Sequence, residues 1–343
     1  MESDDLKNFK PLRMIVRGGG GSGKSVFINT VISTVRRMFE NNGVVQVVAP
    51  TGVAAFNANG QTMHSWWGMQ VRKEFSPPMS NSKKKLLKNK MQYLLALFID
   101  ERSMVSSSDL GSACEMTAEA TFKGHLSQSM WGCLPVVVLV GDDYQLPSVG
   151  PGVLSMFKST TKKSPMTRRG ELCFREFAQD VFELEGSKRI KKSDNKAKQL
   201  NERLRVGNMT EEDMKRLEGL DLANVGRVHG SKVVKSIKKS ALHLYANNAP
   251  IEDHNLWELA NVTNCQNPLA CINAVGKGNF GGKAVNGHFD KNTLKRALLC
   301  RGCKVAIAGK NFWPGWGLFN SACGTVVDIV FKKGENPNDC HLP

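Results

Sequence analysis

The stretch GGGGSGKS at positions 18–25 constrains this chain more than any other feature. It fits the pattern G-x-x-x-x-G-K-[ST] of a phosphate-binding loop. An apolar run at 12–16 precedes it, and apolar residues recur at helical spacing after it, which predicts strand, loop and helix in that order. Glycines let backbone N–H groups converge on phosphate oxygens, and a helix N-terminus adds partial positive charge. The pattern predicts a nucleoside triphosphate site, against the alternative of a flexible glycine loop that matches by chance.

The polar side chains of this loop have separate expected roles. Lys24 is expected to reach the β- and γ-phosphates, and Ser25 to offer its hydroxyl to Mg²⁺. We expect the nucleotide to be bound by Gly18, Gly20, Gly21, Ser22, Gly23, Lys24 and Ser25.

A second motif follows the apolar run at 93–99, which ends in Asp100 and Glu101. Asp100 is expected to hold Mg²⁺, directly or through water. Glu101 is expected to orient and deprotonate the attacking water. An Asp-Glu pair after an apolar run is common, but a phosphate loop about 75 residues upstream makes the pair specific.

Two more apolar runs, at 44–49 and 135–140, end in the polar loops APTGVAA and GDDYQLPSVG. Polar loops at the carboxyl ends of parallel strands are where open α/β folds bind ligands. Gln145 in the second loop is placed to reach a γ-phosphate. These features predict an α/β P-loop NTPase, with a RecA-like parallel-sheet domain over residues 11–178.

The rest of the chain, 179–343, carries weaker signals and is predicted to form an incomplete second RecA-like domain. Thr210 is expected to cap a helix, with Asp213 as its capping-box partner. Further strands are expected at 181–184, 241–245, 304–307 and 325–330, and further helices at 196–204 and 251–260.

The formal net charge is +16, from 47 Lys and Arg against 31 Asp and Glu. Such an excess favours a polyanionic partner, most simply nucleic acid, although solubility or a basic proteome would also account for it. A small basic insertion at about 68–92 contains a lysine run. That run either contacts phosphates or forms a solvated helix face.

The segment GQTMHSWW, which ends in Trp66 and Trp67, has two interpretations. One ring of the pair could stack on a nucleic-acid base. Tandem tryptophans are also typical of core packing. The sequence leaves both open.

Nine cysteines, an odd number, argue against a secreted disulfide framework. Cys300 and Cys303 form one C-x-x-C without a second pair, so no zinc site is expected. No apolar stretch is long enough for a membrane span, and the acidic N-terminus is not a signal peptide. We expect an intracellular protein without a membrane partner.

In order, GGGGSGKS, APTGVAA…GQTMHS, LFIDERSMV and LVGDDYQLPSVGPG closely resemble the motifs of PIF-type DNA helicases, in the RecD-like branch of superfamily 1. The second half is similar, more weakly, to the branch found in Helitron transposons and large DNA viruses. The resemblance implies ATP- and Mg²⁺-dependent 5′ to 3′ translocation on single-stranded DNA, duplex unwinding and DNA junctions as partners. It also implies roles in DNA repair, recombination and telomere maintenance, in the nucleus or mitochondrion if the source is eukaryotic.

The same resemblance assigns roles to particular residues. Gln145 would sense the γ-phosphate and couple it to DNA, and Arg189 would stabilise charge on the transferred phosphoryl group. With these two, Lys24 and Glu101 complete the implied catalytic set. The implied DNA contacts are Thr51, Gly52, Thr62, His64 and Trp66.

Three departures from the family pattern matter. No glutamine precedes the phosphate loop to read adenine, Ile190 stands where glutamine is usual, and no T-x-H-K or terminal arginine motif occurs before Pro343. We therefore interpret the chain as a fragment, a truncated product or a decayed copy. Three functions stay open: a helicase, a module that binds ATP and single-stranded DNA without cycling, and a P-loop NTPase that moves no strand. The oligomeric state is not predicted.

Overall fold

The computed structural model describes residues 10–70, 77–121, 130–132, 134–148, 164–191, 193–264, 266–273, 288–289, 293–294, 296–307, 313 and 316–330. The chain forms two compact units, Met1–Asp213 and Met214–Pro343. Each unit is described by itself below.

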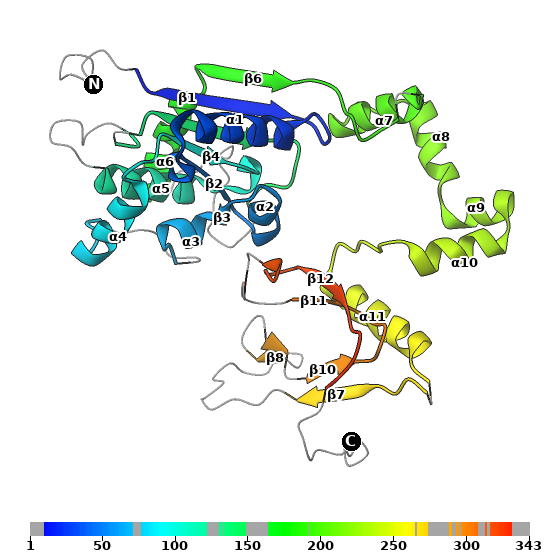
Figure 1. The fold of residues 1–343 in the computed structure, drawn as a ribbon. Helices are drawn as coiled ribbons and strands as arrows, with labels where there is room; N and C mark the ends of the chain where they lie inside the picture. The colour runs from blue at the N-terminus through cyan, green and yellow to red at the C-terminus, as the bar shows by residue number, and fades with distance from the viewer. Residues whose placement is uncertain are drawn as a thin grey trace. The chain divides into compact units, whose positions relative to one another are not determined.

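A six-stranded sheet with the order β3-β2-β4-β5-β1-β6 forms the centre of the first unit (Figure 1). Every neighbouring pair of strands in it is parallel. The predicted α/β class with a parallel sheet is confirmed. The strands are β1 (Leu12–Gly18), β2 (Val45–Ala49), β3 (Gln61–Thr62), β4 (Ala96–Ile99), β5 (Val136–Gly141) and β6 (Asp180–Leu184).

Alternate residues of the central strands point to opposite faces of the sheet, and both faces are buried. Leu97 and Ile99 of β4 lie in one apolar cluster, whereas Phe98 between them lies in the other. Val137 and Val138 of β5 divide in the same way. This explains why β4 and β5 are continuous apolar runs.

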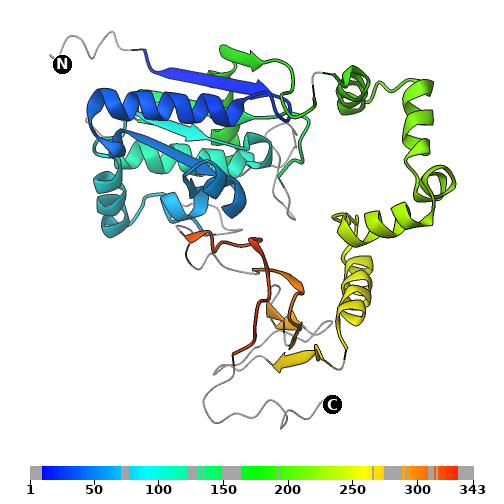
Figure 2. The ribbon, with the colours of Figure 1, turned by 45° about the vertical axis from the view of Figure 1, so that its right-hand side comes forward.

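Helices cover both faces of the sheet. Helix α1 buries Ile28 and Ile32 against one face, across which it runs in Figure 2. The opposite face is covered by residues of α3, α4, α5 and α6, such as Trp67 and Leu110. The helices of this unit are α1 (Lys24–Phe39), α2 (Gly52–Asn57), α3 (Met63–Trp67), α4 (Asn81–Met91), α5 (Ser107–Ala120), α6 (Pro165–Phe177) and α7 (Asn195–Arg205), and α8 (Glu211–Gly219) begins at its end.

The first unit extends further than the predicted boundary at residue 178, because β6 pairs with β1 from Met14↔Asp180 to Gly18↔Leu184. The strand expected to open the second domain thus completes the first sheet. Helix α7 also lies in this unit, which continues to Asp213. The predicted capping box is present: the Thr210 N–H donates to Asp213 Oδ2 at 3.0 Å, and the Asp213 N–H to Thr210 Oγ1 at 3.2 Å.

The described strands of the second unit form two-stranded antiparallel pairs, β7–β10, β8–β9 and β11–β12. That the unit is RecA-like therefore stays a prediction. Its helices are α9 (Leu222–His229), α10 (Ser231–Ser240) and α11 (Asn248–Val262). Its strands are β7 (Ala270–Asn273), β8 (His288–Phe289), β9 (Thr293–Leu294), β10 (Arg296–Leu299), β11 (Lys304–Ala306) and β12 (Cys323–Thr325).

Two strand predictions in this unit were wrong. Residues 241–245 are irregular. The ring centroids of His243 and His254 lie 4.4 Å apart, and Leu242 and Leu244 are exposed. The strand expected at 325–330 ends at Thr325, beyond which Val327 and Val330 are exposed. An alternating apolar pattern does not produce a strand where its apolar side chains have no core to pack against.

Candidate nucleotide-binding site

The phosphate loop connects β1 to α1, as its pattern predicts. Gly21 and Gly23 have φ angles of 83° and 105°, which favour glycine, and Gly23 caps α1. Lys24 is the first residue of the helix, so its side chain starts at the positive end of the helix dipole.

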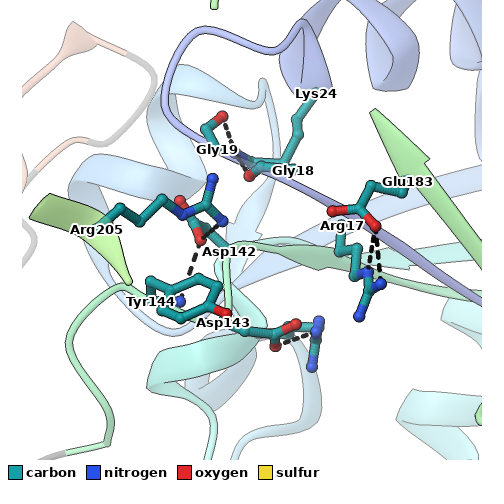
Figure 3. A network of polar contacts seen from close by, with 10 residues as sticks. Arg17, Gly18, Gly19, Lys24, Asp142, Asp143, Tyr144, Glu183 and Arg205 are labelled. Carbon is teal, nitrogen blue, oxygen red and sulfur yellow. Dashed lines mark hydrogen bonds and ion pairs between the residues drawn. The ribbon is translucent and has the colours of Figure 1, made fainter. Parts of the chain in front are cut away.

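The ammonium group of Lys24 lies on its own loop (Figure 3). Its Nζ donates to the carbonyl oxygens of Gly18 at 2.7 Å and Gly19 at 3.1 Å. Burial lowers the pKa of Lys24, while the nearby carboxylates of Asp142, Glu101 and Asp100 act in the opposite direction. The lysine and three carboxylates therefore share one electrostatic environment at the carboxyl edge of the sheet.

Asp100 and Glu101 follow β4 directly, and burial raises the pKa of both carboxyl groups. The Glu101 N–H donates to Asp100 Oδ1 at 2.9 Å, which fixes the Asp100 side chain. Glu101 has a φ of 52°, an unusual backbone conformation for a residue with a side chain. Its buried Oε2 has no hydrogen-bond partner among the described residues. An unsatisfied buried carboxylate oxygen indicates a site that binds something further.

The turn after β5 contains two aspartates with different partners. Asp142, only 4% exposed, accepts from Nη2 of Arg205 and from the Tyr144 N–H at 3.1 Å. Asp143 accepts from Nη2 of Arg102, a buried arginine next to Glu101. The turn is therefore held on one side to the β4 end and on the other to α7 (Figure 3).

Arg189 approaches the phosphate loop from the turn after β6. The Lys188 N–H donates to the Gly21 carbonyl at 2.9 Å, and Ser187 Oγ donates to the Gly20 carbonyl at 2.9 Å. The Arg189 side chain is exposed, and its guanidinium opposes the effect of burial on the pKa of Glu101. The structure thus brings Arg189, Glu101 and Lys24 to one loop from three separate parts of the sequence.

Gln145 is exposed in the turn after β5, and its backbone N–H donates to the Asp142 carbonyl at 3.3 Å. Ser25 is exposed in the first turn of α1, and Ser22 is buried within the loop. Ser22 lies in the phosphate loop, and Ser25 directly follows Lys24 in α1. No described contact joins the Gln145 side chain to the loop.

Two of the expected DNA contacts cap helices. Thr51 accepts from the Ala54 N–H at 3.2 Å at the start of α2, and Thr62 accepts from the Ser65 N–H at 3.3 Å at the start of α3. Gly52 is the first residue of α2 and His64 lies partly exposed in α3. The carboxyl ends of β2 and β3 carry these four residues.

Trp66 does not present its ring to solvent, in contrast to its predicted role. The residue is 6% exposed and lies in the apolar cluster under α3, and Lys90 Nζ lies 5.3 Å from its ring centroid. Trp67 is fully buried and donates through Nε1 to Thr117 Oγ1 at 3.0 Å. Both rings pack in the core because the apolar face of α3 points to the sheet. We therefore no longer count Trp66 among the residues expected to contact DNA.

The described part of the basic insertion contains one helix, α4, with irregular residues before it. Leu87 and Met91 of α4 are buried in the same cluster as Trp66. Lys83 and Lys90 donate to the carbonyls of Gly68 at 3.0 Å and Trp66 at 3.2 Å, at the end of α3. Residues 71–76 of the predicted insertion lie outside the described residues.

Sequence reasoning missed Asp142, Arg102 and Arg205. Asp142 lies in the recognised GDDYQLP motif, and Arg102 directly follows Glu101, so their motifs offered a signal. Arg205 ends an ordinary amphipathic helix, and no local pattern indicates that it reaches the phosphate loop.

The described parts of the chain contain no cluster of three or more His, Cys, Asp or Glu residues arranged to bind a metal ion. Nor is any described helix both long enough and apolar enough to cross a bilayer.

Sequence comparison finds relatives of one kind. A Psychrobacter protein named ATP-dependent DNA helicase Pif1 is 34% identical over 151 residues, 43% of this chain and 21% of the relative. The Emericella nidulans ATP-dependent DNA helicase PIF1 is 33% identical over 138 residues, 39% of this chain and 18% of the relative. The chain thus spans about a fifth of the length of these curated relatives.

Solved structures of Pif1 helicases share the fold. The Candida albicans Pif1 helicase superposes with a TM-score of 0.61 at 23% identity, covering 92% of this chain and 65% of that one. A Bacteroides Pif1 helicase in complex with ADP-AlF3 and single-stranded DNA superposes with a TM-score of 0.54 at 19% identity, covering 96% and 68%. The family profile described as PIF1-like helicase matches residues 4–214, more than half of the chain. With its phosphate loop, its acidic β4 end and its parallel sheet, the chain belongs to the PIF1-like helicase family.

Proposed function

We propose that this chain binds ATP and uses its hydrolysis to move 5′ to 3′ along single-stranded DNA and to open duplexes, as an ATP-dependent DNA helicase. One observation carries the proposal: Lys24, Glu101 and Arg189 converge on a single phosphate loop. Family membership agrees with it. A related Bacteroides helicase has been captured with ADP-AlF3 and single-stranded DNA.

The proposed hydrolysis divides the chemistry among these residues. Lys24 exchanges its carbonyl partners, Gly18 and Gly19, for phosphate oxygens. Glu101 accepts a proton from the attacking water, a role that its raised pKa favours near neutral pH. Arg189 stabilises negative charge on the phosphoryl group as it transfers.

The oxygen donors at the β4 end and the start of α1 fit Mg²⁺, a cation that prefers carboxylate and hydroxyl ligands. Asp100, half-buried and oriented by the Glu101 N–H, and Ser25 would hold the ion. When bound, the ion would neutralise charge on the phosphates.

We propose that single-stranded DNA and DNA junctions contact the loops that carry Thr51, Gly52, Thr62 and His64. The net charge of +16 suits a polyanion. Gln145 would couple nucleotide state to this surface, since its turn is held to both α7 and the β4 end. A DNA substrate implies an intracellular location, nuclear or mitochondrial in a eukaryote.

A second candidate is a module that holds ATP and DNA without turnover. Ile190 beside Arg189 favours it, because an isoleucine side chain cannot make the polar contacts of the glutamine that is usual at this position. The described antiparallel pairs of the second unit also leave the opposite wall of a two-domain ATP site unassigned.

Steady-state and single-turnover ATP hydrolysis, each with and without single-stranded DNA, separates these candidates. We expect DNA to stimulate steady-state turnover. Binding of ATP and DNA without stimulated turnover would favour the module, and turnover indifferent to DNA would favour an NTPase that moves no strand.

A further inference from the structure

Arg205, the last residue of α7, contacts three groups around the phosphate loop (Figure 3). Its Nη2 donates to Oδ1 of the buried Asp142. Its guanidinium carbon lies 4.8 Å from the centroid of the Tyr144 ring, a cation–π contact. Its side chain is 30% exposed. The Arg205 guanidinium is therefore held by an ion pair and by stacking on a ring, and its side chain stays partly exposed to solvent.

The third contact is with the loop itself. A Cβ on Gly19 would overlap Nη1 of Arg205, so the guanidinium fills the space that a side chain at this position would occupy. The carbonyl of Gly19 also accepts from Lys24 Nζ at 3.1 Å. Arg205 and Lys24 thus meet at one residue of the loop, and Asp142 lies between their charges.

The charges around Gly19 explain why the pair of Arg205 and Asp142 matters for nucleotide binding. Polyphosphate brings several negative charges to a loop whose neighbour, Asp142, is itself negative and almost buried. Arg205 neutralises that carboxylate and adds a positive charge beside Gly19. Without it, the other cations near Asp142 are Lys24, which the phosphates need, and Arg102, which is already paired with Asp143.

We propose that Arg205 is a positioning residue of the nucleotide site, which neutralises Asp142 and holds it beside Gly19 so that Lys24 is available to polyphosphate. This role rests on the proposed function, since it concerns the same loop. It differs from the role of Arg189, which approaches Gly20 and Gly21 from the β6 turn. It also connects the end of α7 to nucleotide binding.

The chain offers a matched control on the same helix. Arg203 forms a comparable pair with Asp213, with its Nε and Nη2 at 2.6 and 2.7 Å from the carboxylate oxygens, but has no described contact with the loop. Arg203→Ala therefore removes an arginine–aspartate pair without changing the charge at Gly19.

The test measures the dissociation constant of Mg-ADP by isothermal titration calorimetry on the full chain. We expect Arg205→Ala to weaken binding about tenfold, less than a fully buried pair would give because Arg205 is partly exposed. Adding Asp142→Asn to Arg205→Ala should recover most of the affinity, because the uncompensated carboxylate is then gone. Arg205→Lys should fall between, and Arg203→Ala should stay within about twofold of wild type.

Gly19→Ala keeps the test independent of how well Arg205→Ala folds, because the added methyl group displaces the guanidinium and leaves Asp142 unchanged. We expect it to weaken binding by a smaller factor and to have no further effect when Arg205→Ala is present. Wild-type affinity in folded Arg205→Ala, or no recovery with Asp142→Asn, would overturn the role of Arg205 alone. A wild-type chain that binds no nucleotide would overturn the proposed function as well.

Discussion

Lys24 donates through Nζ to the carbonyl oxygen of Gly18, 2.7 Å away, so the lysine of the phosphate loop is bonded to the loop that it serves. Nucleotide binding has to replace this bond and the 3.1 Å bond to Gly19. The exchange is favourable because phosphate oxygens carry full charge and carbonyl oxygens only a dipole.

Lys24→Ala should abolish ATP turnover and weaken nucleotide binding by about ten- to a hundredfold, the usual effect of losing a charged hydrogen-bond donor. Binding of single-stranded DNA, measured by fluorescence anisotropy at several salt concentrations, should keep its affinity and salt slope, because its phosphate contacts lie elsewhere. A collapse of DNA affinity in this variant would contradict the separation of the two sites. Lys88→Ala, on the exposed side of α4, is a control for the loss of one positive charge.

Glu101→Gln should bind nucleotide, lose turnover and gain stability at neutral pH. Burial raises the pKa of Glu101 above its ordinary value of 4.5, so the folded state binds the proton more tightly than the unfolded state. The stabilisation from protonation is fully present below pH 4.5 and is lost as the pH rises through the raised pKa.

The melting temperature of Glu101→Gln should therefore exceed that of wild type at pH 7 by more than at pH 4. Thermal denaturation at the two pH values measures this difference. An equal difference at both would show that Glu101 is not desolvated.

Trp66→Ala should destabilise the first unit by ~3–5 kcal/mol, the usual cost of removing a buried tryptophan. Chemical denaturation measures the free energy of unfolding, and Trp66→Phe, which keeps most of the apolar volume, should lose much less. The folded fraction should bind single-stranded DNA as wild type does. A selective loss of DNA affinity at unchanged stability would restore the base-stacking role.

Gly170→Ala should destabilise the chain by ~1–3 kcal/mol or more, because α5 and α6 approach each other too closely for a methyl group. A Cβ on Gly170 would overlap the Ser107 carbonyl, which is backbone and cannot rotate away. Gly219→Ala, where a Cβ would meet nothing within 4 Å, is the control and should be neutral or stabilising. Equal melting temperatures for Gly170→Ala and wild type would contradict this close approach.

The features that sequence reasoning found are those encoded locally. The phosphate loop, the acidic pair after β4 and the buried parallel strands each follow from a few consecutive residues, and the family follows from their order. A strand was predicted at 181–184, but its membership in the first sheet was not, because pairing with β1 depends on residues far apart in the sequence. Neither hydrophobic periodicity nor a short motif shows which strand another strand will pair with.

The same limit applies within the site. Arg205 reaches Gly19 only through the course of the chain from β6 to the end of α7, and its helix looks like any amphipathic helix. Trp66 was ambiguous for a different reason: a ring that could stack on a base and a ring that packs have the same local sequence. Burial in the folded unit decided between them.

The adjacent aspartates after β5 have a mechanical consequence. Asp142 is bonded to the end of α7, and Asp143 to the arginine beside Glu101. The turn that carries Gln145, three residues beyond Asp142, is therefore tied by charged pairs to two separate elements of the first unit.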